Sequence, residues 1–321
     1  EKGASKSANY PPRSMGVKDI SYGEGCDVVR DSLTIAMWAS ILLAVRWVLH
    51  QAFTRSWAKR MLGLPPKGKL SPKDSLLTEK FCKYFWHGIV YLGLFVWGLR
   101  ILSEEAWSPF KTGSLNTVWV DYPHPSSEKP VLKAFVMAQV AWYAHGFVES
   151  LLVDKFRNDF AVMLIHHVLS AILLLGSFWG NAHRVAIVVC VEQDLSDILM
   201  YVSKMFEKAV AVPWTQNNAL RSYLLVQLTT AWWSTRVFVL GTLCYQCFVV
   251  LGPSGLFTPG GPDAHYLSIF LIGQLGLLWV MQVFWAVGLL KMTIDQLVKG
   301  SFSDFFHDSK KNEKKLEGKA K

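Results

Sequence analysis

Two long apolar segments joined by a short turn decide the fold of this chain: residues 159–206 read DFAVMLIHHVLSAILLLGSFWGNAHRVAIVVCVEQDLSDILMYVSKMF. The segments 159–179 and 182–206 are each long enough to cross a bilayer, which takes about 20 mostly apolar residues. Gly180 and Asn181 between them predict a tight turn, so the two helices are expected to be antiparallel neighbours. Both segments carry ionisable side chains, which are costly inside a membrane and commonly functional there.

The composition of the whole chain agrees with a membrane protein. Of its 321 residues, 51% are hydrophobic and only 18% are charged, against about 25% charged residues in an ordinary soluble domain. This excludes a disordered chain, a collagen-like chain and a small disulfide scaffold. The net charge of +9 lies in terminal and loop clusters, which favours anchoring at the membrane surface over nucleic-acid binding.

Hydropathy predicts an all-α protein with seven transmembrane helices. They cover residues 32–50, 81–102, 131–153, 159–179, 182–206, 222–251 and 266–297. The segment 51–80 and the tail 299–321 hold seven Lys or Arg each, and both fall on one side of the membrane if there are seven spans. The positive-inside rule then places the N-terminus outside the cytoplasm and the C-terminus in it.

The same pattern divides the chain into four parts. We expect a polar lumenal segment at 1–31, a first span with a basic cytoplasmic linker at 32–80, a six-helix domain at 81–299 and a basic cytoplasmic tail at 300–321.

The fifth predicted span carries an unusual row of polar side chains. It has three carboxylates in six residues, and each costs about 2.5–3.5 kcal/mol at membrane depth on insertion scales. A 4-3-4-3 spacing places five of its residues on one helical face: Cys190, Asp194, Asp197, Tyr201 and Lys204. Lipid cannot be what this face contacts, so it is expected to point into the protein.

The fourth predicted span supplies partners for these carboxylates. It contains the pair His166 and His167, with Ser170 on the same face as His166. At 1.5 Å per residue, His166 lies about 10 Å from the cytoplasmic end of its helix, and Asp197 and Asp194 lie about 13 and 18 Å from the same side. The spacing therefore predicts a cluster of imidazoles and carboxylates in the cytoplasmic half of the bilayer.

Such a cluster has three chemical uses. Imidazole with carboxylate suits general-base or nucleophilic catalysis, in which the carboxylate orients the ring. Two His and two Asp could also hold zinc, although adjacent His side chains point about 100° apart on a helix and do not easily share one metal. The third use is a structural network between helices, or the handling of ions.

Polar residues on three other predicted spans indicate a polar-lined cavity between the helices. They are Gln139, Tyr143, Gly146 and Glu149 or Ser150 in the third span, Gln227, Thr230, Ser234 and Arg236 in the sixth, and Gln274 and Gln282 in the seventh.

The order of these residues resembles the Lag1 motif of the ceramide synthases, within the TRAM-LAG-CLN8 (TLC) membrane proteins. The resemblance is carried by NDF at 158–160, MLIHHVLS at 163–170, SF at 177–178, Asn181, RV at 184–185, DLSD at 194–197 and KM at 204–205. It extends to Arg46, to Lys80, Phe81 and Trp86, to Trp119 and DYP at 121–123, and to Arg236, and so covers about residues 32–300.

The resemblance implies a TLC bundle with an internal lipid cavity, in the membrane of the endoplasmic reticulum. It implies transfer of a fatty acyl group from acyl-CoA to the amine of a sphingoid base, with no metal or other cofactor. His166, His167, Asp194 and Asp197 would then be catalytic. The substrate-binding residues would be Ser170, Gln193, Tyr201, Tyr143, Gln139, Arg236 and Lys204. Expected partners are the two substrates, membrane lipid and a second ceramide synthase in a homo- or heterodimer, with no nucleic acid.

Two positions depart from the family pattern. Ser170 stands where the family has threonine, which keeps the hydroxyl. Gln193 stands where the family has a histidine before its first aspartate, and glutamine cannot act as a base. Two alternatives to an active synthase follow: an inactive relative that pairs with or regulates an active one, and a TLC protein that binds or transfers lipid.

Overall fold

The computed structural model of the protein describes residues 27–120, 122, 124, 129–152, 160–251 and 262–299. Every regular element within these ranges is helical, as the sequence predicts. Most of the N-terminal segment 1–31 and the whole tail 300–321 lie outside the described residues.

The long helices correspond to the seven predicted segments. They are α1 (Val28–Leu49), α3 (Pro72–Glu104), α5 (Pro130–Leu152), α6 (Phe160–Trp179), α7 (His183–Lys208), α8 (Asn218–Trp232) and α10 (Pro262–Lys299). Shorter elements extend or connect them: the π-helical turn η1 (His50–Thr54), α2 (Arg55–Met61), α4 (Pro109–Thr112), the 3-10 helices η2 (Leu115–Trp119) and η3 (Pro213–Gln216), the π-helical turn η4 (Trp233–Val239), α9 (Leu240–Tyr245) and the π-helical turn η5 (Gln246–Leu251).

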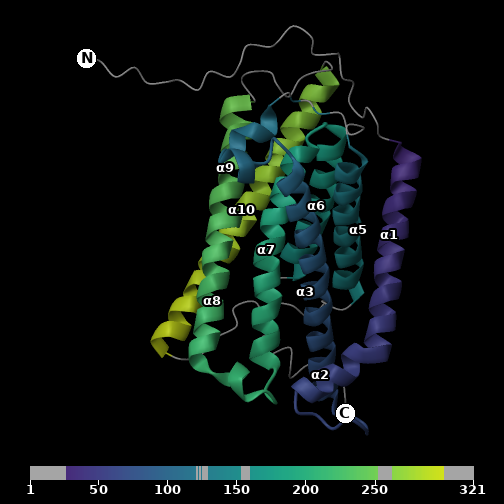
Figure 1. Ribbon diagram of the computed structural model, residues 1–321, viewed down its shortest axis with the longest axis vertical. Helices are drawn as coiled ribbons and strands as arrows, with labels where there is room; N and C mark the ends of the chain where they lie inside the picture. The colour runs from purple at the N-terminus through teal and green to yellow at the C-terminus, as the bar shows by residue number, and fades with distance from the viewer. Residues whose placement is uncertain are drawn as a thin grey trace.

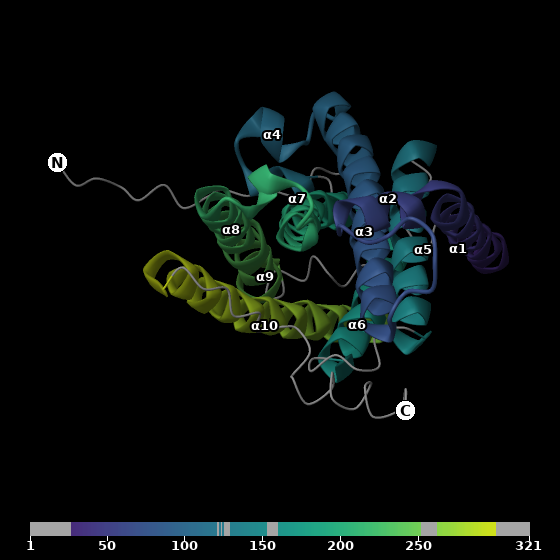
Figure 2. The ribbon, with the colours of Figure 1, turned by 90° about the horizontal axis from the view of Figure 1, so that it is seen from below.

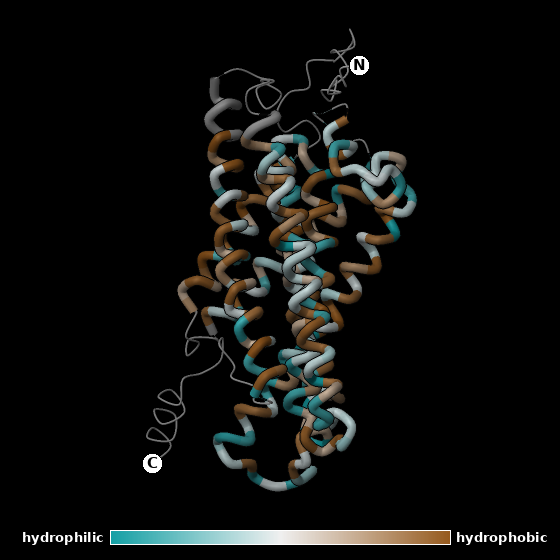
Figure 3. The backbone as a smooth tube through the Cα atoms, turned by 90° about the vertical axis from the view of Figure 1, so that its left-hand side faces the viewer, coloured by the Kyte–Doolittle hydropathy of each residue, from teal (hydrophilic) through white to brown (hydrophobic). Residues whose placement is uncertain are grey.

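The long helices run side by side along the length of the molecule (Figure 1). The polar helix α7 packs against α3, α5, α6 and α8, whereas α1 lies at the edge of the bundle against α5 (Figure 2). Hydrophilic residues gather at the two ends of the bundle, and much of the helix length between them is hydrophobic (Figure 3). The row of polar residues on α7 is thus enclosed by other helices, as its insertion cost requires.

Within the ranges that the structure describes, five helical segments are long and apolar enough to cross a membrane. They are Val28–Met61, Pro72–Glu104, Pro130–Leu151, Phe160–Trp179 and Ile269–Lys299. Two segments that the sequence analysis counted as spans, α7 and the run from α8 to η5, are not among these five. In α7, Glu192, Asp194 and Asp197 lower the hydropathy of a helix that other helices surround. The count of seven spans and the orientation in the membrane stay predictions.

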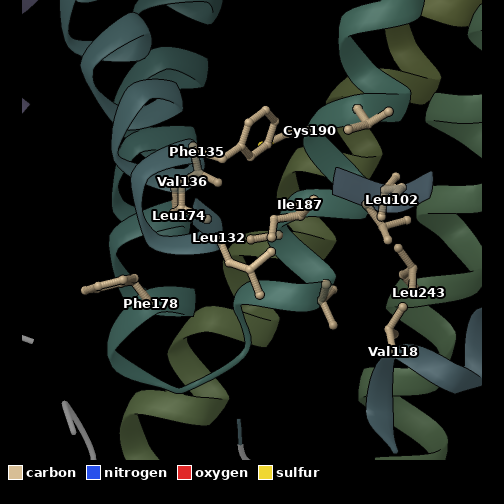
Figure 4. Close-up of a cluster of buried hydrophobic side chains, with 14 of the residues drawn as sticks. Leu102, Val118, Leu132, Phe135, Val136, Leu174, Phe178, Ile187, Cys190 and Leu243 are labelled. Atoms are coloured by element: carbon tan, nitrogen blue, oxygen red, sulfur yellow. The ribbon is translucent and has the colours of Figure 1, made fainter. Parts of the chain in front are cut away.

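The apolar core fills the half of the bundle near the turn between α6 and α7. Phe135 of α5, Ile187 of α7, Leu102 of α3 and Leu243 of α9 have no exposed surface, and Figure 4 shows their cluster. Gly98 lets α3 approach α7 there, because a Cβ at this position would lie 2.2 Å from Cγ2 of Val191. This packing fixes α7 against α3.

The turn between α6 and α7 sets the register of the two helices. Asn181 has a φ of 55°, in the left-handed region that asparagine tolerates better than most residues. The hydroxyl of Tyr122 donates to the carbonyl of Gly180 at 2.7 Å, and the backbone N–H of His124 donates to the carbonyl of Asn181 at 3.0 Å. Burial lowers the pKa of His124 to about 3, so this loop residue stays neutral. The predicted tight turn is present.

The expected basic linker between the first two spans is largely helical. The first helix continues through η1 and α2 to Met61, and α3 already begins at Pro72. Ser71 caps α3 by accepting from the backbone N–H of Asp74 at 3.1 Å, and a proline at the first helical position favours this start. Hydropathy locates the apolar parts of these helices but does not reveal their polar extensions.

Candidate active site

One cavity of about 140 Å³ lies between six of the long helices, and it is about ten times larger than the 10–15 Å³ that a single water needs. It extends from Asp197 in α7 to Glu207 and Arg221, near the end of α7 and the start of α8. Its lining includes Lys83, His87 and Tyr91 from α3, Tyr143, Glu149 and Ser150 from α5, His166 and His167 from α6, Asp197, Tyr201, Ser203, Lys204 and Glu207 from α7, Arg221 from α8 and Arg236 from η4.

His166 and His167 of α6 both reach this cavity and are both half-buried. The Tyr143 ring lies close to both, with centroid distances of 6.2 Å to His166 and 6.1 Å to His167. Trp285 of α10 packs edge-on against His166 at 5.3 Å. The Nδ1 atom of His166 is buried without a hydrogen-bond partner. Two aromatic rings therefore hold the imidazole by packing, and its Nδ1 is not occupied by a protein hydrogen bond.

Asp197 enters the same cavity paired with Arg236. The guanidinium Nη2 lies 2.6 Å from the Asp197 carboxylate, and both residues are buried. A buried ion pair persists only when its remaining hydrogen-bonding groups are also satisfied. Arg236 meets this condition, because it donates to the hydroxyl of Ser196, to the carbonyl of Gln193 at 2.8 Å and to Gln282 at 3.4 Å.

Asp194 lies behind the cavity wall. It is 2% exposed, and it accepts a hydrogen bond from the side-chain amide of Gln139 at 2.8 Å. It does not line the cavity, although it shares a helical face with Asp197. The two aspartates are therefore unequal: Asp197 faces the cavity and Asp194 supports the packing of α7 against α5.

This arrangement corrects one expectation from the sequence. We expected the two aspartates to orient the imidazole of His166 directly. Instead, Asp194 is bonded to Gln139 and Asp197 to Arg236, and neither is bonded to His166. Each carboxylate has a partner on another helical element, Gln139 on α5 and Arg236 on η4, and a carboxylate bound to a guanidinium has less need of an imidazole.

Seven of the eleven predicted site residues line the cavity: His166, His167, Asp197, Tyr143, Tyr201, Lys204 and Arg236. The other four are buried outside its lining: Asp194, Gln139, Gln193 and Ser170. The ammonium of Lys204 lies over the Tyr201 ring at 5.6 Å, and Tyr201 itself stacks on Tyr91 at 5.8 Å. Gln193, which stands where the family has a histidine, is thus not a residue of the cavity lining.

A second polar cluster, which the sequence pattern did not predict, lies on the same cavity. Glu149 of α5 is contacted by Nε2 of His87 at 3.0 Å, by Nη2 of Arg46 at 2.6 Å and by Nζ of Lys83 at 4.0 Å. A signal for it was present, because His87 and Lys83 are ionisable residues within an otherwise apolar span, and such residues are functional candidates by default.

The zinc alternative gains no support from the geometry. Among the residues that the structure describes, no group of three or more His, Cys, Asp or Glu side chains is placed to hold a metal ion. The cavity instead presents imidazoles beside a buried ion pair, which is an arrangement for proton transfer or for nucleophilic attack by a ring nitrogen.

Comparisons with known proteins show which family the chain resembles. Residues 80–291 match the TLC domain family. The chain is 28% identical over 262 residues to ceramide synthase 4 of Bos taurus, covering 81% of this chain and 59% of that relative. It is 29% identical over 287 residues to an ASC1-like protein of Solanum lycopersicum, covering 85% and 89%, and 25% identical over 234 residues to ceramide synthase LOH1 of Arabidopsis thaliana, covering 70% and 71%.

The chain spans about three fifths of the length of ceramide synthase 4, since the match covers 59% of it. The family match includes α3 to α10 almost completely, and with them the cavity, His166, His167 and Asp197. The chain therefore belongs to the TLC domain family and is related to the ceramide synthases.

Proposed function

We propose that this protein transfers a fatty acyl group from acyl-CoA to the amine of a sphingoid base, and so makes an N-acyl sphingoid base. The observation that carries the proposal is the meeting of His166, His167 and the Asp197–Arg236 pair in one cavity, in a chain whose curated relatives include ceramide synthases. The apolar walls of the cavity, formed by residues such as Leu225, Leu228, Trp285 and Leu289, suit a hydrocarbon chain.

The chemistry needs a proton acceptor. A sphingoid amine is largely protonated at neutral pH, and it must lose a proton before its nitrogen can attack the thioester carbonyl. His166 can accept this proton, or its ring nitrogen can attack the thioester first and carry the acyl group as an acyl-imidazole. In either route the amide bond forms, the carbon–sulfur bond breaks and the CoA thiol leaves. The ion pair of Asp197 with Arg236 supplies a fixed polar wall beside the rings.

We place this reaction in the membrane of the endoplasmic reticulum, with seven spans, the N-terminus lumenal and the C-terminus cytoplasmic. The distribution of Lys and Arg supports this orientation, and the reticulum follows from the family. The end of the cavity at Glu207 and Arg221 would then face the cytoplasm, where acyl-CoA is dissolved.

The transfer reaction is tested by the release of free CoA from the purified full-length chain. We expect thiol release from acyl-CoA to depend on added sphingoid base, and to differ between acyl chains of different length. Release that is independent of the base would indicate simple thioester hydrolysis and would contradict the proposal.

A glycine next to His167 provides a second test of the site. A Cβ at Gly146 would lie 3.0 Å from Cε1 and 3.2 Å from Nδ1 of His167, so Gly146→Ala displaces the ring. The ring must move by a few tenths of an ångström, and we expect transfer to fall by less than the roughly 10²-fold that a 1 Å displacement of a reacting group can cost. Gly93→Ala is the matched control, because no atom lies within 4 Å of its Cβ. An equal loss in both variants would contradict the role of His167.

A catalytically inactive partner of an active synthase is the second candidate, and Gln193 is the observation that favours it. Against this, the backbone carbonyl of Gln193 accepts from Arg236, and its buried side chain lies outside the cavity lining. We therefore expect Gln193→His to change transfer by less than about tenfold. If the wild type is inactive and Gln193→His gains activity, the result would support the role of an inactive partner instead. If the wild type and Gln193→His both bind lipid and neither transfers an acyl group, the result would support a lipid-transfer role.

A further inference from the structure

The first helix reaches the cavity through a chain of ionic contacts. Arg46 of α1 lies 2.6 Å from Glu149 of α5, and Glu149 lies 3.0 Å from Nε2 of His87 in the cavity wall. The Glu149 side chain is 2% exposed, and these contacts therefore act in a medium of low dielectric constant, where electrostatic interactions are strong.

The ring of His87 is held at both nitrogens. Nδ1 lies 3.0 Å from the backbone carbonyl of Lys83 and Nε2 lies 3.0 Å from the Glu149 carboxylate. Both partners are oxygen acceptors, so only the doubly protonated imidazolium satisfies both contacts. The rings of Trp142 and Tyr201 pack against His87 at 5.0 and 4.8 Å. Both ring nitrogens lie against protein oxygens, so the ring of His87 is held in one orientation in the cavity wall.

His87 and the histidine pair line the same cavity. Gly146 of α5 is next to the His167 ring, and Glu149 follows it three residues later, which is about 4.5 Å along the helix axis. Negative charge develops on the thioester oxygen and on the departing sulfur during acyl transfer. A positive group fixed in advance near that charge lowers the barrier.

Helix α1 itself is loosely embedded. Asp31 is its only buried residue, and lipid is as apolar as the side chains that α1 presents, so burial does little to hold it. Two ion pairs fasten it to α5: Asp31 with Lys133 at 2.8 Å, and Arg46 with Glu149 at 2.6 Å. The two pairs are fifteen residues apart on α1 and sixteen apart on α5, which corresponds to about 22–24 Å along the helix axes. Of these two pairs, only Arg46 with Glu149 includes a residue that lines the cavity.

We propose that Arg46 is a positioning residue of the acyl-transfer site, which acts through Glu149 to fix the imidazolium of His87 in the cavity wall. Docking of α1 onto α5 is then a condition for full activity. This role rests on the proposed function, because it concerns the same cavity and the same reaction.

The test compares the two ion pairs of α1 in the full-length protein. We expect Arg46→Gln to lower kcat by roughly 10-fold to 10²-fold, with a smaller change in KM for acyl-CoA. Lys133→Gln breaks the other ion pair of the same helix and should stay within about twofold of wild type. Adding Arg46→Gln to His87→Gln should cause no further loss, because the arginine acts through that ring. Arg46→Lys should recover part of the activity.

Equal losses in the Arg46 and Lys133 variants would overturn the inference, since α1 would then have only a structural role. If the losses of activity from Arg46→Gln and His87→Gln multiply in the double variant, the inference would be overturned as well. The thermal unfolding midpoint of each purified variant shows whether it is folded. If Arg46→Gln does not fold, Arg46→Lys decides: a lowered kcat at an unchanged midpoint supports the role, and an unchanged kcat overturns it. A folded wild type without transfer activity would overturn the proposed function itself, and this role with it.

Discussion

Replacement of His166 by alanine is expected to lower the rate of acyl transfer by roughly 10²–10⁴-fold, the usual contribution of one acid–base group. The ring lies in the cavity between Tyr143 and Trp285, and its Nδ1 has no protein partner, so alanine removes the group that accepts the amine proton or carries the acyl group. The measurement is the initial rate of N-acyl product formation at saturating substrates, followed by mass spectrometry.

His50→Ala is the matched control for this variant. His50 pairs with Glu79 at 3.3 Å, but unlike His166 it does not line the cavity. We expect this variant to keep the wild-type rate within about twofold. A loss in His50→Ala as large as that in His166→Ala would mean that any lost histidine impairs the fold, and it would remove the argument for catalysis. Unchanged activity in His166→Ala would transfer the role to His167.

Replacement of Arg236 by methionine is expected to destabilise the protein by about 3–5 kcal/mol, because it leaves the buried carboxylate of Asp197 without its partner. The same change removes donors to Ser196 and to the carbonyl of Gln193. The free energy of unfolding in mixed micelles, from a denaturant titration, measures this loss. Adding Asp197→Asn to Arg236→Met should recover part of the loss, because no unpaired charge then remains.

Arg100→Met provides the comparison for this second effect. Arg100 also pairs with a carboxylate, Glu104 at 3.2 Å, but its side chain is 79% exposed. Exposed pairs contribute about 0–1 kcal/mol, so this variant should unfold almost as the wild type does. A loss for Arg236→Met as small as that for Arg100→Met would mean that the Asp197–Arg236 pair does not stabilise the site.

Much of the site could be predicted from helical spacing. The polar face predicted for α7 points into the protein, because Asp197, Tyr201 and Lys204 line the cavity together. Asp194 lies on the same face but behind the wall, because the cavity ends near the Asp197–Arg236 pair. Spacing defines a face, but it does not define how far along the helix a cavity extends.

The pairing of Asp197 with Arg236 could not be predicted in the same way. Arg236 lies in η4, where the helix adopts π geometry. The wider turn changes the rotation of the residues that follow it, and no apolar pattern encodes that change. The network of Glu149 was missed for a related reason, since its three basic partners lie on α1 and α3, far from Glu149 in sequence. Only the packing of α1 and α3 against α5 brings them together.

The most direct test is a paired incubation of the purified wild-type protein and the His166→Ala/His167→Ala variant with a labelled sphingoid base and acyl-CoA. We predict labelled N-acyl product from the wild type and none above background from the variant, with both proteins folded and lipid-bound. No product from a folded wild type, or equal product from the two proteins, would contradict the proposal that this histidine pair catalyses acyl transfer.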